Sequence, residues 1–342
     1  MKILYAIQGT GNGHVSRAIE IIPWLKQKGK VDVLISGYQS ELKLPFEVTY
    51  KYNGLSFIFG KRGGIDLWNT YLRMNSIQLL REIKTLPIEK YDLIISDFEP
   101  VSSWAAWLAK IPSVGLSNQV ATIHPHAPKP KMKNMMGKMI LEHYAPNSFS
   151  YGLHYEKIDN NIFTPVIRKK IREIQPTDGE HYTVYLPSYE DERIINFLKN
   201  HREIEWQVFS KSSKKKYRKK NVLINPIRED LFIKSMASSK GVLCNAGFGT
   251  TTEALFLKKK LMVIPMKGQY EQHCNAAALK KIGVPTIKKL KKKYVSEFAG
   301  WISENNRVEV NYPDITGEIV EMIIDHHAGK KVEATHPEFL FQ

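Results

Sequence analysis

The residues of this chain that are best suited to chemistry follow a short apolar strand near the N-terminus. The sequence GTGNGH places His14 directly after Gly9, Gly11 and Gly13, and a segment with helical periodicity follows. Histidine accepts protons near neutral pH, and a glycine loop lets a ligand approach the backbone closely. We therefore interpret His14 as a general base in the first turn of a helix. A histidine that only packs there is the structural alternative.

The same loop partly matches a dinucleotide-binding fingerprint. That motif, G-x-G-x-x-G, needs a last glycine where this chain has His14, and an acidic residue about twenty residues later. The next strand, VDVLIS, ends at Ser36 and Gly37 without an acid. The sequence therefore disfavours NAD or flavin binding.

Asp97 is the carboxylate that the sequence offers to orient this histidine. It ends the apolar strand YDLIISD, and in a parallel sheet ligands sit beyond the carboxyl ends of the strands. A base histidine is usually held by such a third group. Two alternatives stay open. Asp97 caps the helix that begins after Pro100, or the nearby Glu99 is the partner of His14.

A second candidate site lies in the C-terminal half, where a strand ends in the sequence CNAGFGTTTE. Gly247, Phe248, Gly249, Thr250 and Thr251 lead into a helix. The free N–H groups and the dipole of a helix N-terminus attract anions. The pattern therefore predicts a cradle for phosphate groups.

Acidic and amide side chains flank this predicted cradle. Glu253 lies three residues after Thr250, which is also the spacing of a capping box, a purely structural alternative. Glu271 and Gln272 follow the next strand, KLMVIPM. An adjacent acid and amide offer both acceptors and donors to sugar hydroxyls.

Strands and helices alternate in two blocks along the chain. Continuous apolar strands alternate with helical segments up to about residue 123, strand signals are weak in 124–178, and the alternation restarts at YTVYLPS. This pattern predicts an α/β protein of two Rossmann-like parallel-sheet domains that face each other across a cleft. We place the N-terminal domain at 1–170, the C-terminal domain at 178–325 and a tail at 326–342.

The composition is that of a globular protein, with 342 residues, 43% of them hydrophobic. No apolar run reaches the roughly 18 residues of a membrane helix, and no signal peptide is visible. Two cysteines fit a reduced, cytoplasmic compartment. The formal charge of +16 indicates an anionic partner: nucleic acid, a membrane face or a phosphorylated substrate. Lysine runs at 211–220 and 288–293 contribute, and solvated loops are their structural alternative.

These segments resemble the GT-B glycosyltransferases, the group that includes the glucuronosyltransferases and the bacterial peptidoglycan N-acetylglucosaminyltransferase. In their signature a strand ends in H-A-G, a glutamate follows eight residues after the His, and D/E-Q-x-x-N-A comes after the next strand. Here Asn245 replaces the His, Glu253 falls at the eighth position, and EQHCNA begins at Glu271. GTGNGH and IISDFEP resemble the acceptor loop and the strand–Asp–x–Phe segment of the peptidoglycan enzyme.

The resemblance implies that one set of residues binds the nucleotide-sugar donor: Ser188, Ile227, Asn245, Gly247, Phe248, Gly249, Thr250, Thr251, Glu253, Glu271 and Gln272. Within this set the loop 247–251 would bind the diphosphate, Glu253 the ribose, and Glu271 and Gln272 the sugar. Ser188 would contact phosphate, and the backbone near Ile227 would hold the base. Gly9, Gly11 and Gly13 would form the acceptor loop. The chain departs from the family where Asn245 replaces a phosphate-contacting histidine, and where the glycine-rich turn after YTVYLP is missing.

We therefore expect an inverting, metal-independent transfer from a nucleotide-sugar, UDP-linked by family default, to an acceptor hydroxyl. His14, oriented by Asp97, is the expected base. We expect no cofactor besides this co-substrate, because no D-x-D motif stands at a strand end and neither Cys244 nor Cys274 lies in a metal-binding cluster. A nucleotide-sugar epimerase of the same fold is the alternative. A nucleic-acid-binding protein is a weaker one that only the charge suggests.

The segment 124–146 bears on the acceptor. Met132, Met135, Met136 and Met139 fall on one helical face with lysines around it. Such a helix can rest on an anionic membrane surface, which fits a lipid-linked acceptor and a peripheral place at the inner face of the membrane. A helix that packs its methionines into the domain is the alternative. The sequence leaves open whether the acceptor is a lipid-linked sugar or another glycan.

Overall fold

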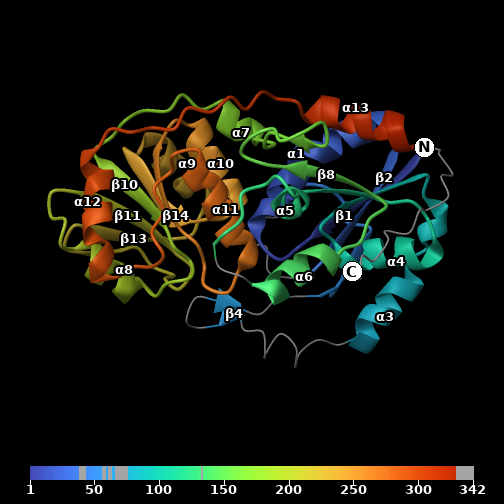
Figure 1. Cartoon of the computed structure of the whole chain (residues 1–342), viewed down its shortest axis with the longest axis horizontal. Helices are drawn as coiled ribbons and strands as arrows, with labels where there is room; N and C mark the ends of the chain where they lie inside the picture. The colour runs from blue at the N-terminus through green and yellow to red at the C-terminus, as the bar shows by residue number, and fades with distance from the viewer. Residues whose placement is uncertain (38–43, 56–58, 61–63, 66–75, 132–133, 329–342) are drawn as a thin grey trace.

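The computed structural model describes residues 1–37, 44–55, 59–60, 64–65, 76–131 and 134–328, and contains two parallel sheets that lie side by side (Figure 1). The first sheet has the strand order β3-β2-β1-β6-β7-β8-β9. The second has the order β12-β13-β11-β10-β14-β15, in which only the β12–β13 pair is antiparallel. The expected α/β class with two Rossmann-like sheets is therefore confirmed.

The first half of the chain forms the seven-stranded sheet, the helices around it and a separate antiparallel pair of two-residue strands, β4 and β5. Its elements are β1 (Lys2–Gln8), α1 (Asn12–Lys28), β2 (Lys30–Ser36), β3 (Tyr50–Tyr52), β4 (Phe59–Gly60), β5 (Gly64–Ile65), α3 (Ser76–Thr85), β6 (Leu93–Asp97), α4 (Pro100–Ala109), β7 (Val114–Ser117), α5 (Asn118–Ile123), α6 (Met135–His143), β8 (Phe149–Leu153), β9 (Ile162–Phe163) and α7 (Lys169–Arg172).

The second half forms the six-stranded sheet, and its last helix returns to the first domain. Its elements are β10 (His181–Tyr185), α8 (Asp191–Leu198), β11 (Glu205–Ser210), β12 (Tyr217–Lys219), β13 (Val222–Pro226), α9 (Glu229–Ser238), β14 (Gly241–Asn245), α10 (Phe248–Phe256), β15 (Lys260–Ile264), α11 (Tyr270–Lys281), α12 (Val295–Ser303) and α13 (Thr316–His327).

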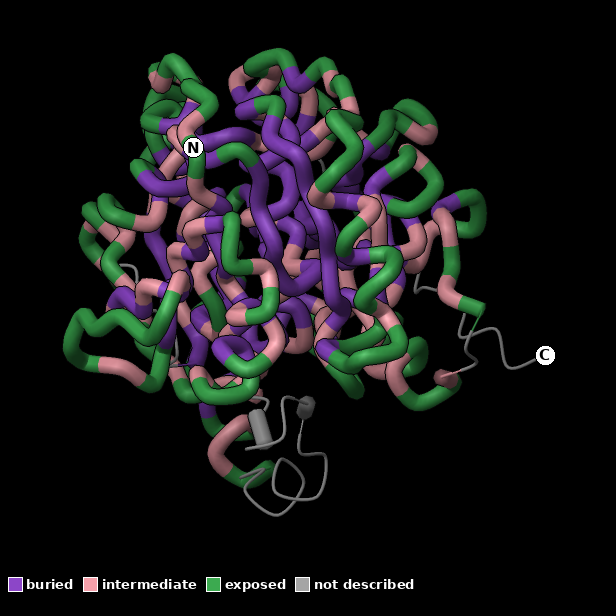
Figure 2. Tube along the Cα trace, turned by 90° about the vertical axis from the view of Figure 1, so that its left-hand side faces the viewer, coloured by how far each residue is buried: buried purple, intermediate pink, exposed green. Residues whose placement is uncertain are grey.

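Continuous apolar sequence explains the central strands of both sheets. Every residue of β6, β14 and β15 is buried, as it must be where helices cover both faces of a parallel sheet. Figure 2 shows buried segments running through the middle of the molecule, with exposed residues around the outside. The parallel pairing sets the carboxyl ends of the strands along one edge of each sheet, and Ile7 of β1 lies opposite Asp97 of β6.

Helix α13 crosses back from the second domain and packs against α1 (Figure 1). Lys28 of α1 donates a hydrogen bond to Glu321 at 2.8 Å, and the backbone of Gly317 lies directly against the ring of Trp24. The C-terminal domain that we placed at 178–325 thus ends within a helix that belongs by its packing to the N-terminal domain. Most of the tail at 326–342 lies outside the described residues.

The region between the two sequence blocks contains structure that its weak strand signals did not indicate. β8 pairs in parallel with β7 and β9 pairs with β8, so both extend the first sheet at one edge. The predicted strand PSVGLSNQ is shorter than expected, because Ser117 caps a new helix, α5, through the backbone N–H of Val120. That helix start brings Asn118 and Gln119 to the domain boundary.

Candidate functional site

His14 and Asp97 form the pair that the sequence predicted. His14 lies in the first turn of α1, and its Nδ1 is 2.8 Å from Oδ1 of Asp97. Asp97 is fully buried at the end of β6, so the bond is shielded from water. In a neutral imidazole, a carboxylate at Nδ1 favours the tautomer with the proton on Nδ1, which leaves Nε2 as an acceptor. Nε2 has a long contact of 3.5 Å with the Gln119 amide.

The alternative in which Asp97 caps α4 is wrong, because Glu99 is the cap. The Glu99 side chain accepts hydrogen bonds from the backbone N–H groups of Val101 and Ser102 at 2.8 and 2.7 Å. Burial raises the pKa of the Glu99 carboxyl, and the hydrogen bonds that the carboxylate accepts offset part of this increase. Between the two acids, Phe98 adopts a left-handed φ of 53°, a conformation that costs energy and separates their directions.

Arg17 is a member of the site that the sequence analysis missed. It lies on α1 one turn after His14, is 6% exposed, and holds Asp97 with two hydrogen bonds. Its Nε donates to Oδ2 at 2.8 Å and its Nη2 donates to Oδ1 at 2.5 Å. Its spacing of three residues from His14 was the available signal, since i and i+3 share a helix face.

Burial alone would raise the pKa of Asp97, but the charge of Arg17 and the contacts with His14 outweigh it, so the pKa is lowered. Asp97 is therefore ionised. The hydroxyl of Tyr5 lies nearby, and its burial raises its pKa well above the usual range. Tyr5 is consequently neutral beside the charged pair.

The first glycine loop is shaped as its sequence requires. Gly11 has a φ of 106°, which favours glycine, and a side chain on Gly9 would collide with the carbonyl oxygen of Gly37. A methyl group on Gly13 would meet nothing within 4 Å, so the backbone beside His14 is open. Gly13 lies opposite Gly249, whose own methyl position is 3.9 Å from the Gly13 Cα. The two glycine loops thus face each other across the domain boundary.

The second glycine loop opens helix α10, as predicted, but without a side-chain cap. Gly247 occupies the cap position, and the helix begins at Phe248, two residues before Thr250. The capping-box interpretation of Thr250 and Glu253 is therefore wrong. The free N–H groups at this helix start remain for a ligand. Within the loop, the Thr251 hydroxyl is 2.7 Å from the Tyr155 hydroxyl of the first domain.

Glu253 lies in the middle of α10 and is paired with Arg168. The Arg168 Nε and Nη2 groups donate to the two carboxylate oxygens, the latter at 2.6 Å, while Nη1 donates to Glu229. Arg168 lies on the segment that leads from the first domain to the second and is 7% exposed. The sequence analysis did not identify it, because nothing near position 168 marks it as a partner of position 253.

Glu271 and Gln272 begin helix α11 next to α5 of the other domain, as Figure 1 shows. The Glu271 carboxylate accepts from the amides of Asn118 at 2.9 Å and Gln119 at 3.0 Å. Gln272 is 7% exposed, and its Oε1 accepts from the backbone N–H of Met266 at 2.9 Å. Glu271 thus reaches across the domain boundary, whereas Gln272 braces its own domain.

Asn245, which replaces the family histidine, is committed to the protein. Its Nδ2 donates to the carbonyl of Ile264 at 2.7 Å, and its Oδ1 accepts from Ser188 at 3.0 Å. Ser188 and Asn245 therefore lie together at the ends of adjacent strands, β10 and β14. Ile227, after β13, is half-buried and lines the same cavity as Asn245.

A cavity of about 810 Å³ joins these groups across the domain boundary. The first domain contributes Gly11, Gly13, Arg17 and Asn118 among others, and His14 is not among the lining residues. The second domain contributes most of the donor residues that the resemblance implied: Ile227, Asn245, Gly247, Phe248, Gly249, Thr250, Glu253, Glu271 and Gln272. Ser188 and Thr251 are not among its lining residues.

Two lysines of the basic run 211–220, Lys211 and Lys214, also line this cavity. Their loop is anchored by Asp191, which accepts from the Ser210 and Ser213 hydroxyls. Part of this run is therefore at the site rather than a solvated loop alone.

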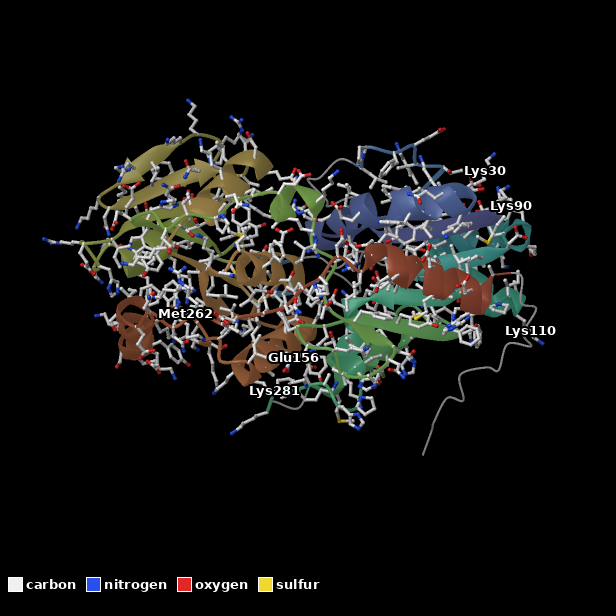
Figure 3. The ribbon with its side chains drawn as sticks, turned by 90° about the horizontal axis from the view of Figure 1, so that it is seen from above. Lys30, Lys90, Lys110, Glu156, Met262 and Lys281 are labelled. Atoms are coloured by element: carbon white, nitrogen blue, oxygen red, sulfur yellow. The ribbon has the colours of Figure 1, made fainter. Side chains whose placement is uncertain are left out.

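Elsewhere on the domain boundary, Glu156 and Lys281 form an ion pair at 3.3 Å, and Figure 3 shows them side by side.

Two kinds of feature are absent from the described part of the chain. Its His, Cys, Asp and Glu side chains form no group of three or more that could hold a metal ion. None of its helices is long and apolar enough to cross a membrane.

Comparison with known proteins connects this geometry to a family. Residues 1–302 match the family described as Glycosyl transferase family 1, and no curated protein matches the chain. Acinetobacter baumannii MurG is 14% identical, with a TM-score of 0.56 over 95% of this chain and 99% of that one. S. aureus MnaA, solved with UDP, is 11% identical (TM-score 0.61; 97% and 98%). The calicheamicin glycosyltransferase CalG4 is 12% identical (0.59; 96% and 99%). These structures share the GT-B fold with this chain.

Proposed function

As a member of glycosyl transferase family 1, this chain is a glycosyltransferase, and we propose that it moves a sugar from a UDP-sugar to an acceptor hydroxyl with inversion at the anomeric carbon. The observation that carries the proposal is the 2.8 Å bond between buried Asp97 and His14, set opposite the glycine loop of α10. A base on one domain and an anion cradle on the other suit a transfer across the cavity between them.

The proposed reaction moves one proton and exchanges one bond. His14 Nε2 takes the proton of the acceptor hydroxyl while its Nδ1–H donates to Asp97. The acceptor oxygen attacks C1 of the sugar from the face opposite the nucleotide, and the bond from C1 to the diphosphate oxygen breaks. A positioned base typically contributes ~10²–10⁴-fold to such a step.

The leaving diphosphate gains negative charge as that bond breaks. The N–H groups of the first helical turn, from Phe248 to Thr250, would meet this charge together with the helix dipole. A contact that strengthens as charge develops accelerates the reaction as well as binding the donor. We propose that this cradle acts without a metal ion.

Donor binding and transfer are tested separately. A thermal-shift panel of nucleoside diphosphates identifies the nucleotide, because a ligand at 100 times its Kd stabilises the protein by about 2.7 kcal/mol. Incubation with the matching nucleotide-sugar alone, followed by product analysis, then tests the alternative. If the donor sugar is epimerised when no acceptor is added, epimerisation becomes the better proposal for the reaction. Absence of binding to any nucleotide would overturn the proposal.

We propose further that the acceptor is lipid-linked and that α6 rests on the membrane. Met135, Met136 and Met139 are 83%, 56% and 55% exposed, so the alternative in which they pack into the domain is wrong; Met132 lies outside the described residues. No residue of α6 is buried, and its Lys138 forms an ion pair with Glu142 at 3.4 Å. An exposed apolar face on a chain with a formal charge of +16 suits an anionic bilayer.

Flotation with anionic vesicles tests this surface. At low salt the wild type should float with the vesicles, and so should the matched control Met135→Leu/Met136→Leu. Met135→Glu/Met136→Glu should stay in the lipid-free fraction. If the wild type does not float, a glycan acceptor free in solution becomes the better proposal.

A further inference from the structure

Arg17, which holds the buried Asp97, has no role in the reaction as proposed. Asp97 is fully buried, and Arg17 is 6% exposed and holds both of its carboxylate oxygens. Its Nη2 is also 3.1 Å from His14 Nδ1, so the three side chains touch one another. The cluster therefore contains one fixed negative charge and two side chains able to carry a positive one.

A carboxylate taken out of water needs a compensating positive charge nearby. The guanidinium of Arg17 carries its charge at every accessible pH, whereas an imidazole carries one only after it binds a proton. If His14 supplied the compensating charge, it would already hold the proton that a general base must accept. The identity of the residue that balances Asp97 thus decides whether His14 works as a base.

We propose that Arg17 is a positioning residue that balances the buried charge of Asp97, so that His14 stays a neutral imidazole with Nε2 free. This inference rests on the proposed role of His14 as the base. The second hydrogen bond of Arg17, to Oδ2, also fixes the carboxylate rotation that aims Oδ1 at His14.

Other elements packed around His14 carry groups that act on the same balance. From α11 the Glu271 carboxylate approaches through Gln119, whose amide is 3.0 Å from Glu271 and 3.5 Å from His14 Nε2. That negative charge favours a protonated histidine. Its hydrogen bonds from Asn118 and Gln119 disperse part of the charge.

Two further groups lie on the remaining sides. From β1, Tyr5 brings no charge, because burial and then the charge of Asp97 raise its pKa. From α10 the helix start at Gly249 approaches Gly13 and brings a partial positive charge that opposes protonation of His14. Among the described residues, Arg17 and His14 are the basic side chains within ion-pair distance of Asp97.

The test reads the charge of His14 directly, in ligand-free protein, from the ¹⁵N signals of its ring nitrogens at a fixed neutral pH. Arg17→Lys keeps the positive charge, and Arg17→Gln keeps a hydrogen-bond donor without charge. We expect a neutral ring with the proton on Nδ1 in the wild type and in Arg17→Lys. We expect the signals of Arg17→Gln to shift to the imidazolium pattern, and those of Arg17→Gln/Asp97→Asn to return to neutral.

A protonated His14 in the wild type, or a neutral one in Arg17→Gln, would overturn the inference. If Arg17→Gln does not fold, the wild type and Arg17→Lys still decide, since a protonated ring in either contradicts charge balancing. The measurement needs no donor or acceptor. A wild type with the expected spectrum but no transferase activity would therefore count against the proposed function and not against the role of Arg17.

Discussion

Glu253 is the residue whose substitution tests the donor site most sharply, because its carboxylate serves two purposes in our account. In the structure it accepts both arms of the Arg168 guanidinium and is 6% exposed. In the proposed function it also accepts a hydrogen bond from the ribose of the donor. The free energy of unfolding tests the ion pair with Arg168, and the affinity for the nucleotide tests the ribose contact.

The stability effect follows from burial. Removing one partner of a buried ion pair typically costs 3–5 kcal/mol, because the other charge stays buried and unpaired. We expect Glu253→Ala to cost about 3 kcal/mol, at the lower end of that range, since Glu229 still accepts from Arg168. The double variant Glu253→Ala/Arg168→Met removes both charges and should recover most of the loss, as urea unfolding would measure.

The affinity effect follows from the ribose. Hydrogen bonds to a charged group contribute about 1.5–3 kcal/mol, which corresponds to roughly 10- to 150-fold in Kd. We expect Glu253→Gln, which keeps the shape of the side chain, to bind UDP more weakly by about that factor. The wild type should prefer UDP to a dideoxyribose analogue, and this preference should vanish in Glu253→Gln. Equal affinity of wild type and Glu253→Gln for UDP would refute the ribose contact.

Three further predictions concern the rest of the site. His14→Ala should abolish transfer and leave UDP affinity unchanged by calorimetry, whereas Asp97→Asn should slow transfer less; an active His14→Ala enzyme would end the proposed mechanism. Gln272→Ala should weaken nucleotide-sugar binding more than UDP binding, and equal losses would remove the sugar contact. Because the pKa of Asp97 is lowered on folding, its stabilising effect is complete above about pH 4 and is lost as pH falls through the folded value. The wild type should then lose more stability than Asp97→Asn on acid titration.

The sequence was sufficient for the sheets because their strands are continuously apolar. β6, β14 and β15 are buried along their whole length, and each was readable from its composition alone. β9 has two residues, and β8 has a polar or half-buried start, so neither contains enough pattern to be recognised. The sequence also did not predict the domain against which α13 packs, because an amphipathic pattern shows only that one face of a helix is covered.

The site was predictable where one element supplies the signal, and not where two distant elements meet. His14 and the α10 loop follow local glycine patterns, and Asp97 follows from its place at a strand end. Arg168 is 85 residues from Glu253, and Asn118 is 153 residues from Glu271, so only the folded chain pairs them. The capping-box alternative failed for a related reason: the helix begins at Phe248, three residues before the start that a cap at Thr250 would give.

The polar groups expected to bind the donor are already hydrogen-bonded within the protein, and this affects how a donor must bind. Glu271 is held by Asn118 and Gln119 of the other domain, and Glu253 by Arg168. A carboxylate can accept several hydrogen bonds, so a ribose hydroxyl can bind Glu253 beside Arg168, whereas a sugar hydroxyl must share or replace the bonds that Glu271 already accepts. A donor that does engage Glu271 competes with the very contact that joins the domains. Nucleotide-sugar binding should therefore alter the domain boundary more than nucleotide binding does, because UDP alone carries no sugar to reach Glu271.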